Sequence, residues 1–252
     1  MKRGSRPASM LVGLAMFLLL WQVLAWIVHK PILPAPAVVL PVFFRSLSGV
    51  LGVHFLASTV RVLCAIAIAV ILAVPAGLGL GQFKQVDRIF SPLIAILYPI
   101  PKIVLLPVMY ILVGITDVSK VLLIALILFF QVLVVVRDEA AALHPELILS
   151  VRSLGAGRKA LFRYVYLPAS LPAVLTSIRV SVGTAIAVLF IAEQSLTQYG
   201  LGYYIVVETY QVLRYPEMYA GILAMSLLGV LLYLAIEAVE RRVNRHLYAE
   251  ES

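Results

Sequence analysis

Charged residues are scarce in this chain of 252 residues, since Asp, Glu, Lys and Arg together make up only 13% of it. An ordinary soluble domain carries about 25%. Hydrophobic residues account for 63%, and the mean hydropathy is +1.05. So few polar side chains cannot cover a soluble globule, and the apolar residues come in long unbroken runs. The composition therefore excludes an ordinary soluble enzyme or binding domain and indicates a protein whose solvent is the lipid bilayer.

Cysteine is nearly absent as well. With Cys64 as the only cysteine, no intramolecular disulfide can form, and the four histidines are too scattered to give a metal site of the usual Cys/His spacing. The chain also lacks a G-x-x-x-x-G-K-[ST] loop, the segment that cradles ATP phosphates. We therefore expect no catalytic, cofactor or metal site in this chain, and we do not expect it to be an enzyme.

The net charge of +8 has two readings. Basic chains often bind nucleic acid. In a membrane protein, however, Lys and Arg collect in cytoplasmic loops, and the isoelectric point then reports topology. We adopt the second reading and expect the bilayer, rather than nucleic acid, as the partner.

Six apolar spans can be drawn, each near the roughly 20 residues that cross the hydrocarbon core. They cover residues 10–28, 62–81, 89–115, 118–136, 169–192 and 218–236, within one transmembrane domain of residues 1–252. Three basic residues before the first span resemble those of a signal peptide. Its apolar stretch exceeds the usual 7–15 residues and no small-residue cleavage site follows, so we favour a retained helix.

Orientation follows from the lysines and arginines. With the N-terminus inside, thirteen of them fall in cytoplasmic segments, whereas only Lys30, Arg45 and Arg214 fall outside. This bias predicts a multi-pass protein of a bacterial cytoplasmic membrane with both termini in the cytoplasm. Arg179, within the fifth span, is expected to extend its head group inward.

The segment 145–166 is the longest basic stretch between two apolar spans. Pro145 suits a first helical position, and Glu146 in the first turn complements the helix dipole. Leu147, Val151 and Leu154 then fall on one face at helical spacing, and Gly155 is a natural terminator. The basic residues of this segment, and the second glycine of its turn, are Arg152, Arg158, Lys159, Arg163 and Gly157. Physics alone leaves two readings open: a helix that docks into a partner, or a solvated loop.

The third span is the best candidate for the wall of a transport path. It contains Pro99 and Pro101, which remove backbone donors, and broken membrane helices are tolerated where they line protein or water. Packing kinks are the alternative. Lys102, midway along this span, should face the interior, where it either attracts an anion or pairs with an acid such as Glu193; a place near an interface is the further alternative. Glu193 and Gln194 border the outer side as possible gate residues.

Five motifs occur in order along most of the chain. They are L-P-A-P at 33–36, S-T-V-R-V at 58–62, Y-P-I-P-K-I-V-L-L-P at 98–107, G-I-T-D-V-S-K at 114–120 and A-E-Q-S-L-T-Q-Y-G-L-G at 192–202. Together with S-L-G-A-G at 153–157 and the L-P at 167–168, they resemble permease subunits of ATP-binding-cassette importers, in the branch for nitrate, sulfonates, taurine and bicarbonate. The family's E-A-A positions fall on Leu149, Ser150 and Val151, so its acidic start is missing here.

The resemblance implies an all-α membrane protein with six transmembrane helices and the type I (MetI-like) importer fold. It further implies two cytoplasmic ATPase subunits that grip the 145–154 helix and bind the ATP, a second permease copy that forms a homodimer, and a periplasmic or lipid-anchored binding protein. The expected function is ATP-driven import of a small, anionic solute by alternating access. A secondary transporter without ATPases, or a structural membrane protein without flux, are the alternatives. Neither the solute nor the dimer type can be read from the sequence.

Overall fold

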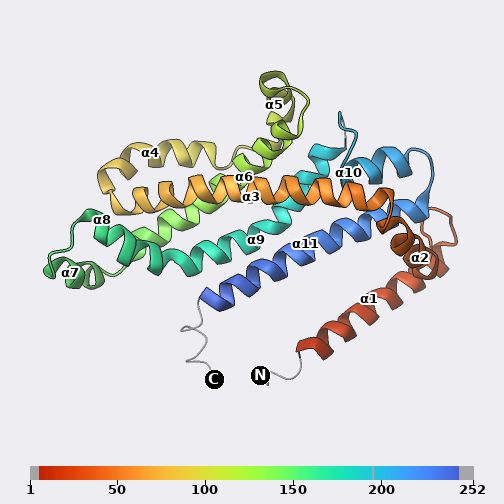
Figure 1. Cartoon of the computed structure of the whole chain (residues 1–252), viewed down its shortest axis with the longest axis horizontal. Coiled ribbons are helices and arrows are strands. Elements are labelled where there is room, and N and C mark those ends of the chain that lie inside the picture. Colours follow the sequence, from red (N-terminus) through yellow and green to blue (C-terminus); the bar gives the residue numbers. More distant parts are fainter. Residues whose placement is uncertain (1–5, 195, 244–252) are drawn as a thin grey trace. The chain divides into compact units, whose positions relative to one another are not determined.

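The computed structural model describes residues 6–194 and 196–243, and no strand occurs among them. Figure 1 shows the chain as a succession of helices. The bounds are α1 Arg6–Val28, α2 Pro36–Leu47, α3 Val50–Gln82, α4 Lys84–Leu97, the 3₁₀ helix η1 Lys102–Leu105, α5 Leu106–Val113, α6 Asp117–Ala142, α7 Pro145–Ser153, α8 Arg158–Leu161, the π-helix η2 Phe162–Tyr166, α9 Leu167–Glu193, α10 Leu201–Tyr203, the π-helix η3 Tyr204–Tyr210 and α11 Tyr215–Val243.

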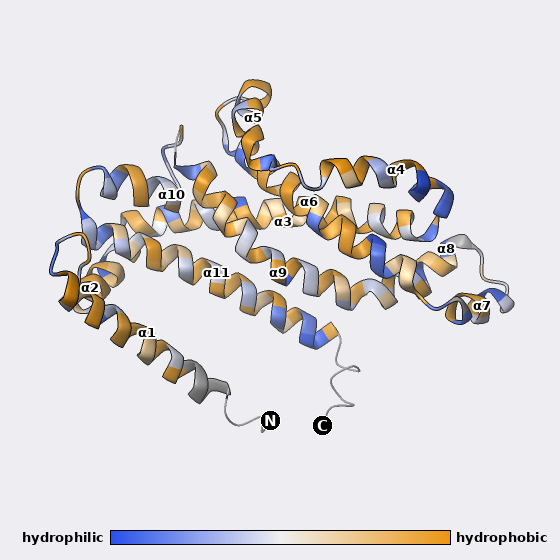
Figure 2. Cartoon of the chain, turned by 180° about the vertical axis from the view of Figure 1, so that it is seen from behind, coloured by the Kyte–Doolittle hydropathy of each residue, from blue (hydrophilic) through white to orange (hydrophobic). Residues whose placement is uncertain are grey.

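Five of the described helical segments are long and apolar enough to cross a membrane: Leu11–Val28, Val50–Gln82, Asp117–Ala142, Lys159–Glu193 and Tyr215–Val243. A sixth crossing exists if α4 and the η1–α5 segment together form one broken span. Apolar residues run along most of each long helix, and hydrophilic residues gather toward helix ends and connections (Figure 2). The prediction of an all-α membrane protein is confirmed.

Two helices differ in extent from the predicted spans. The third span, 89–115, is broken as its prolines indicated: α4 stops at Leu97, and the chain turns by 84° before α5. Pro99 and Pro101 explain the break, since a proline lacks the N–H of a continuing helix and disfavours a helical residue before it. Helix α3 begins at Val50 rather than 62. The polar residues of its first turns, His54, Ser58 and Arg61, are buried in the protein.

The chain divides into two units. The first comprises Met1–Ala57 and Glu193–Ser226, and so holds α1, α2, α10, η3 and the first turns of α3 and α11. Pro36 occupies the first helical turn of α2, where its missing N–H costs nothing. The indole Nε1 of Trp21 donates to the carbonyl of Pro34 at 3.0 Å, and its ring stacks on Tyr219 with centroids 5.6 Å apart. These contacts fasten α1 to the start of α2 and to α11 within this unit.

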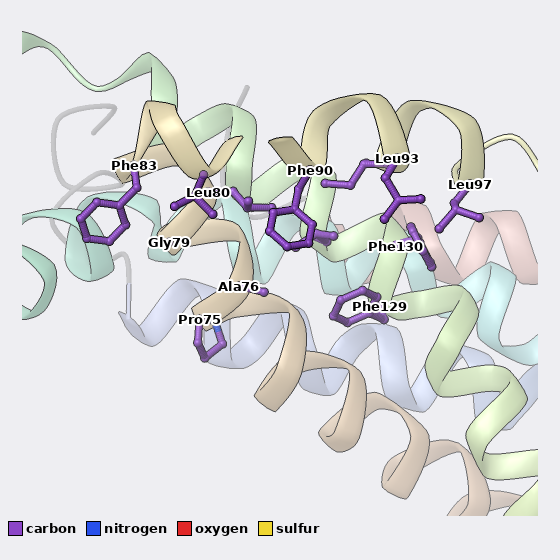
Figure 3. A pocket seen from close by; sticks show the side chains of 13 residues that line it. Pro75, Ala76, Gly79, Leu80, Phe83, Phe90, Leu93, Leu97, Phe129 and Phe130 are labelled. Atoms are coloured by element: carbon purple, nitrogen blue, oxygen red, sulfur yellow. The ribbon is translucent and has the colours of Figure 1, made fainter. Parts of the chain in front are cut away.

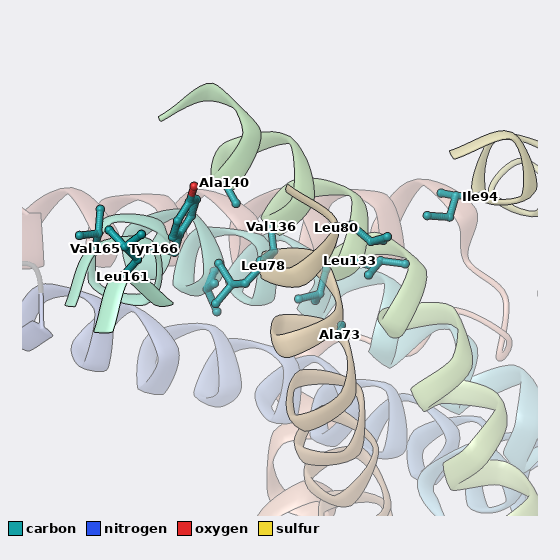
Figure 4. Packing of buried hydrophobic residues seen from close by; sticks show 12 residues of the cluster. Ala73, Leu78, Leu80, Ile94, Leu133, Val136, Ala140, Leu161, Val165 and Tyr166 are labelled. Atoms are coloured by element: carbon teal, nitrogen blue, oxygen red, sulfur yellow. The ribbon is translucent and has the colours of Figure 1, made fainter. Parts of the chain in front are cut away.

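The second unit comprises Ser58–Ala192 and Leu227–Ser252. Its core joins α3, α6 and the α8–η2 segment (Figure 4). Gly77 and Gly81 of α3 lie against α6, where a Cβ at Gly81 would stand 2.5 Å from the Cβ of Ala140. Small residues four apart therefore let these two helices approach closely, as is common in membrane helix pairs.

Candidate coupling and translocation sites

The basic segment forms a helical hairpin. Helix α7 begins at Pro145, carries Glu146 in its first turn and ends at Ser153, which confirms the predicted helix to within one residue. Gly155 has φ +82°, so it reverses the chain in the left-handed region where glycine is favoured. Helix α8 then begins at Arg158, and its first backbone hydrogen bond runs from the N–H of Leu161 to the carbonyl of Gly157 at 3.0 Å. We call residues 145–166 the coupling hairpin.

The second arm of the coupling hairpin is anchored in the core of the second unit. Leu161, Val165 and Tyr166 are buried against α3 and α6, as Figure 4 shows. Ile148 and Val151 of α7 pack against the same cluster from its edge. A well-packed core transmits displacement rather than absorbing it. The hairpin is therefore joined to the ends of the long helices of this unit.

The outer surface of the hairpin is apolar with basic residues around it. Leu147, Leu149, Leu154 and Tyr164 are exposed, and Leu154, just past the end of α7, is 86% exposed. The residues Arg152, Lys159 and Arg163 are also exposed. Of the three residues predicted to share one face, Leu147 and Leu154 are exposed, whereas Val151 packs against the core cluster.

The broken span places Lys102 differently from the prediction. Its Nζ donates to the carbonyls of Leu97, Tyr98 and Ile100 at 2.9, 3.0 and 3.3 Å. It also lies 4.4 Å from the centre of the Phe130 ring on α6. Of the alternatives left open for Lys102, pairing with an acid such as Glu193 is not what the structure shows, because the break in the helix exposes carbonyls at the end of α4 that attract a cation. Its role toward an anion stays a prediction. Lys102 therefore caps α4 and fixes the turn.

A cavity of about 310 Å³ lies beside this turn. Its wall includes Pro101 and Lys102 from the break, Phe130 and Gln131 from α6, and Val188 from α9. The Nε2 of Gln131 lies 3.3 Å from the Oγ1 of Thr184, so an amide and a hydroxyl are joined at its edge. The break, α6 and α9 thus line a partly open hollow with both polar and apolar walls.

A second cavity, of about 420 Å³, is apolar throughout. Side chains of Phe90, Leu93 and Leu97 on α4 face Phe129 and Phe130 on α6 (Figure 3). None of its lining side chains carries a hydrogen-bonding group. It offers nothing that would orient a polar solute, so the smaller cavity is the better candidate for solute contact.

Glu193 and Gln194 belong to the first unit, at the end of α9. Glu193 is fully buried, and its Oε2 accepts from the backbone N–H of Gly202 at 3.0 Å. Gln194 is half-buried. Both lie before the segment that leads to α10. Glu193 therefore fixes the start of α10, and a role of the pair in a gate stays a prediction.

The first unit also holds a buried histidine to which sequence reasoning gave no role. The Nδ1 of His54 accepts from the N–H of Gly200 at 3.0 Å, and its Nε2 lies 3.2 Å from Glu208. The rings of Tyr203 and Tyr204 flank it. Burial raises the pKa of Tyr204 above its ordinary value. Together these contacts hold the glycine-rich entry to α10.

Three ion-pair clusters of the second unit were also missed. Arg137 of α6 grips Asp87 of α4 with two nitrogens, at Nε–Oδ1 and at Nη2–Oδ2. The other clusters join Arg61 and Lys120 to Asp117, and Arg179 to Glu240, with Nε and Oε2 of the last pair 3.0 Å apart. Their members lie 50–61 positions or only three apart in sequence, a spacing that carries no signal of pairing between separate helices.

Apolar helices with one broken span, a cavity with polar lining at the break and a core-anchored basic hairpin are features of a multi-pass transport permease. The chain belongs to the family described as the binding-protein-dependent transport system inner membrane component, whose model matches residues 65–245. It is thus the permease component of an ATP-binding-cassette importer.

Curated relatives match nearly the whole chain. The taurine transport system permease protein TauC of Escherichia coli (strain K12) is 31% identical over 249 residues, which is 95% of this chain and 90% of that protein. The putative aliphatic sulfonates transport permease protein SsuC of Bacillus subtilis (strain 168) is 28% identical, covering 96% of this chain and 90% of that protein. The formylaminopyrimidine transport permease protein ThiX of Halalkalibacterium halodurans is 26% identical, covering 95% of this chain and 96% of that protein.

A solved structure of the MetNI methionine transporter in an inward-facing conformation resembles the fold. The TM-score is 0.64 at 17% identity, and the match covers 77% of this chain and 96% of that one. This likeness confirms the MetI-like permease fold.

Proposed function

We propose that this chain forms the membrane path of an importer for small sulfonates, including amino-sulfonates such as taurine. ATP hydrolysis occurs in two cytoplasmic ATPase subunits, and a substrate-binding protein delivers the solute from outside. The similarity to taurine and aliphatic sulfonate permeases supports this solute class. The lysine at the broken span supports it too, because a net positive charge beside the cavity favours an anion.

One observation carries the mechanism: the coupling hairpin is anchored by its second arm and exposed at its tip. Leu161 and Val165 are locked in the core, whereas Leu154 and the basic residues around it face outward. An apolar helix with a basic rim fits a groove on a partner with acidic edges. We propose that the ATPase subunits bind this tip, and that their closure on ATP moves the helices of the second unit between outward-open and inward-open states.

The same proposal fixes orientation and stoichiometry. The hairpin and both termini lie in the cytoplasm, in agreement with the excess of basic residues on that side. Two copies of this chain pair around the path, one for each ATPase subunit. Permeases of this kind work with two motors, and a homodimer gives both motors the same hairpin.

The test is reconstitution of the chain with its cognate ATPase and binding protein in liposomes. Taurine and butanesulfonate should be taken up only with ATP inside, and each should stimulate ATP hydrolysis several-fold in the presence of the binding protein. Uptake driven by an ion gradient without the ATPase would instead establish a secondary transporter. A coupling hairpin that reacts with an impermeant reagent from the outside would reverse the orientation and end the proposal.

The binding of formylaminopyrimidine-like solutes is the second candidate, because ThiX matches this chain over nearly its full length. Such a solute is a flat heterocycle without a sulfonate. Competition in the same uptake assay separates the two, since only the transported class displaces labelled solute from the assembled importer.

A further inference from the structure

Gln131 is a polar residue in an otherwise apolar stretch of α6. Between Lys120 and Arg137 it is the only polar side chain in this span, set in a run of leucine, isoleucine, phenylalanine and valine. A polar residue in the middle of a membrane helix is costly unless it has a partner, and it commonly marks a path for a solute or ion. Gln131 lies in the wall of the 310 Å³ cavity, next to the break in the third span.

Half of the Gln131 amide is satisfied. Its Nε2 donates to the Oγ1 of Thr184 at 3.3 Å, whereas its Oε1 is buried without a hydrogen-bond partner among the described residues. Thr184 can accept or donate, so the amide can also turn over and bond through its oxygen. In either orientation one end of the amide stays free, and a buried amide group without a partner is unfavourable.

Lys102 completes the site in a different way. The three N–H groups of its ammonium head are used by the carbonyls of Leu97, Tyr98 and Ile100, so none is left to bond a solute. The lining also includes apolar side chains such as Ile127, one turn before Gln131 on α6, and Val188 of α9. The cavity thus combines a fixed cation, one adaptable amide and a short apolar surface.

We propose that this cavity is a solute subsite within the membrane, in which Gln131, held by Thr184, makes the directional hydrogen bond to the head group of a small sulfonate. With the amide turned over, Oε1 accepts from the Thr184 hydroxyl and the free nitrogen donates to a sulfonate oxygen. Lys102 supplies an attractive potential, and Ile127 and Val188 cover the alkyl chain. An amino-sulfonate fits as well, because in the orientation of the structure the free Oε1 accepts from an ammonium group. This proposal rests on the proposed function and names the contact that selects its solute.

Cysteine labelling tests the subsite without requiring transport. In the assembled importer, with Cys64→Ala as background, Gln131→Cys is treated with 2-sulfonatoethyl methanethiosulfonate and with its trimethylammonioethyl analogue. Gln85→Cys, an exposed position on α4, serves as the reference for the intrinsic rates of the two reagents. We expect the anion-to-cation rate ratio to be at least about tenfold higher at position 131 than at 85, and excess taurine to slow the reaction at 131 only.

Ile103→Cys, which also lines the cavity, keeps the test decisive if the first variant does not assemble. A rate ratio at the cavity positions equal to that at position 85 would overturn the subsite. In the same importer, Gln131→Leu should raise the KM for sulfonate uptake about tenfold, the loss of one hydrogen bond of ordinary strength, while Gln85→Leu leaves it unchanged. Unchanged KM in Gln131→Leu also counts against the subsite.

The two failures are distinguishable. If the wild-type importer moves no sulfonate while the anion preference at position 131 is present, the solute class is wrong and the cavity stands as an anion subsite. If sulfonates are transported but labelling at position 131 shows no preference for the anionic reagent, the proposed function is supported and the proposed subsite is refuted.

Discussion

Leu154 and Leu161 provide a matched pair for separating assembly from stability. Both are leucines of the coupling hairpin, but Leu154 is 86% exposed and Leu161 is 3% exposed. Replacing each by alanine removes the same atoms. The chemical change is constant, so any difference in outcome comes from where the side chain lies.

For Leu161→Ala the structure predicts a loss of stability. Deleting a buried leucine costs about 2–5 kcal/mol, because a cavity remains where the side chain packed. In a protein of this size each kcal/mol lowers the Tm by about 2–4 °C, so a fall of at least about 4 °C is expected. The ATPase subunits should still bind. Their hydrolysis should become uncoupled from uptake, because the hairpin no longer moves with α6.

For Leu154→Ala the expected results are reversed. An exposed substitution changes stability by no more than about 0.5 kcal/mol, so Tm stays within about 2 °C of wild type. If Leu154 is an anchor in the ATPase groove, its truncation costs more than about 1 kcal/mol of binding free energy, a loss of at least about fivefold in affinity.

Two measurements on the purified permease decide: the thermal unfolding midpoint, and titration with its ATPase in nanodiscs. Leu154→Ala that binds the ATPase as tightly as wild type would refute the docking of the hairpin tip. Leu161→Ala with an unchanged Tm would refute the anchoring of the second arm.

Three further predictions concern the second unit. Lys102→Met leaves three carbonyls without their cation, so it should abolish uptake and lower the Tm, whereas Lys102→Arg should retain part of the uptake and part of the stability. Equal uptake by Lys102→Met and wild type in proteoliposomes would contradict the capping role. Gly81→Ala should destabilise by about 1–3 kcal/mol in thermal unfolding because its Cβ would meet Ala140, whereas Gly79→Ala has open space and should be neutral or stabilising; similar Tm values for the two would show that α3 and α6 are not in close contact. A double-mutant cycle with Asp87→Asn and Arg137→Gln should give a coupling energy of about 0.5–3 kcal/mol in thermal unfolding, and additive effects would mean that this ion pair contributes nothing.

The coupling hairpin was readable from the sequence because its signals are local. Pro145 and Glu146 start a helix, and Gly155 ends it, whatever surrounds them. The side of α7 that faces the core was misread, since Leu147 and Val151 are equally apolar and only the packing of the second arm chooses between them. Local sequence signals therefore predict that the helix forms, whereas tertiary contacts decide which of its faces is turned toward the core.

The early start of α3 could not be read in the same way. His54, Ser58 and Arg61 interrupt the apolar run, which argues against a span when each residue is taken alone. In the structure all three are buried with partners, so their polarity is satisfied within the protein rather than by water. Lys102 shows the same limit: its sequence neighbours reveal the prolines of the break, but not that the freed carbonyls would become its partners.

Helix α6 connects the features of the second unit along one rigid axis. Near its C-terminal end, Ala140 packs on α3, and Arg137 holds Asp87 at the start of α4. About 15 Å further along the helix, ten residues at 1.5 Å each, Phe130 lies under Lys102. A tilt of about 10° at the hairpin end would therefore shift this region by about 3 Å, enough to make or break the hydrogen bonds that hold the break. Since α6 carries no proline or glycine between these points, it has no hinge to absorb the movement. Force applied to the hairpin would consequently reach the cavity wall, so α6 connects the proposed ATPase contact to the proposed solute contact.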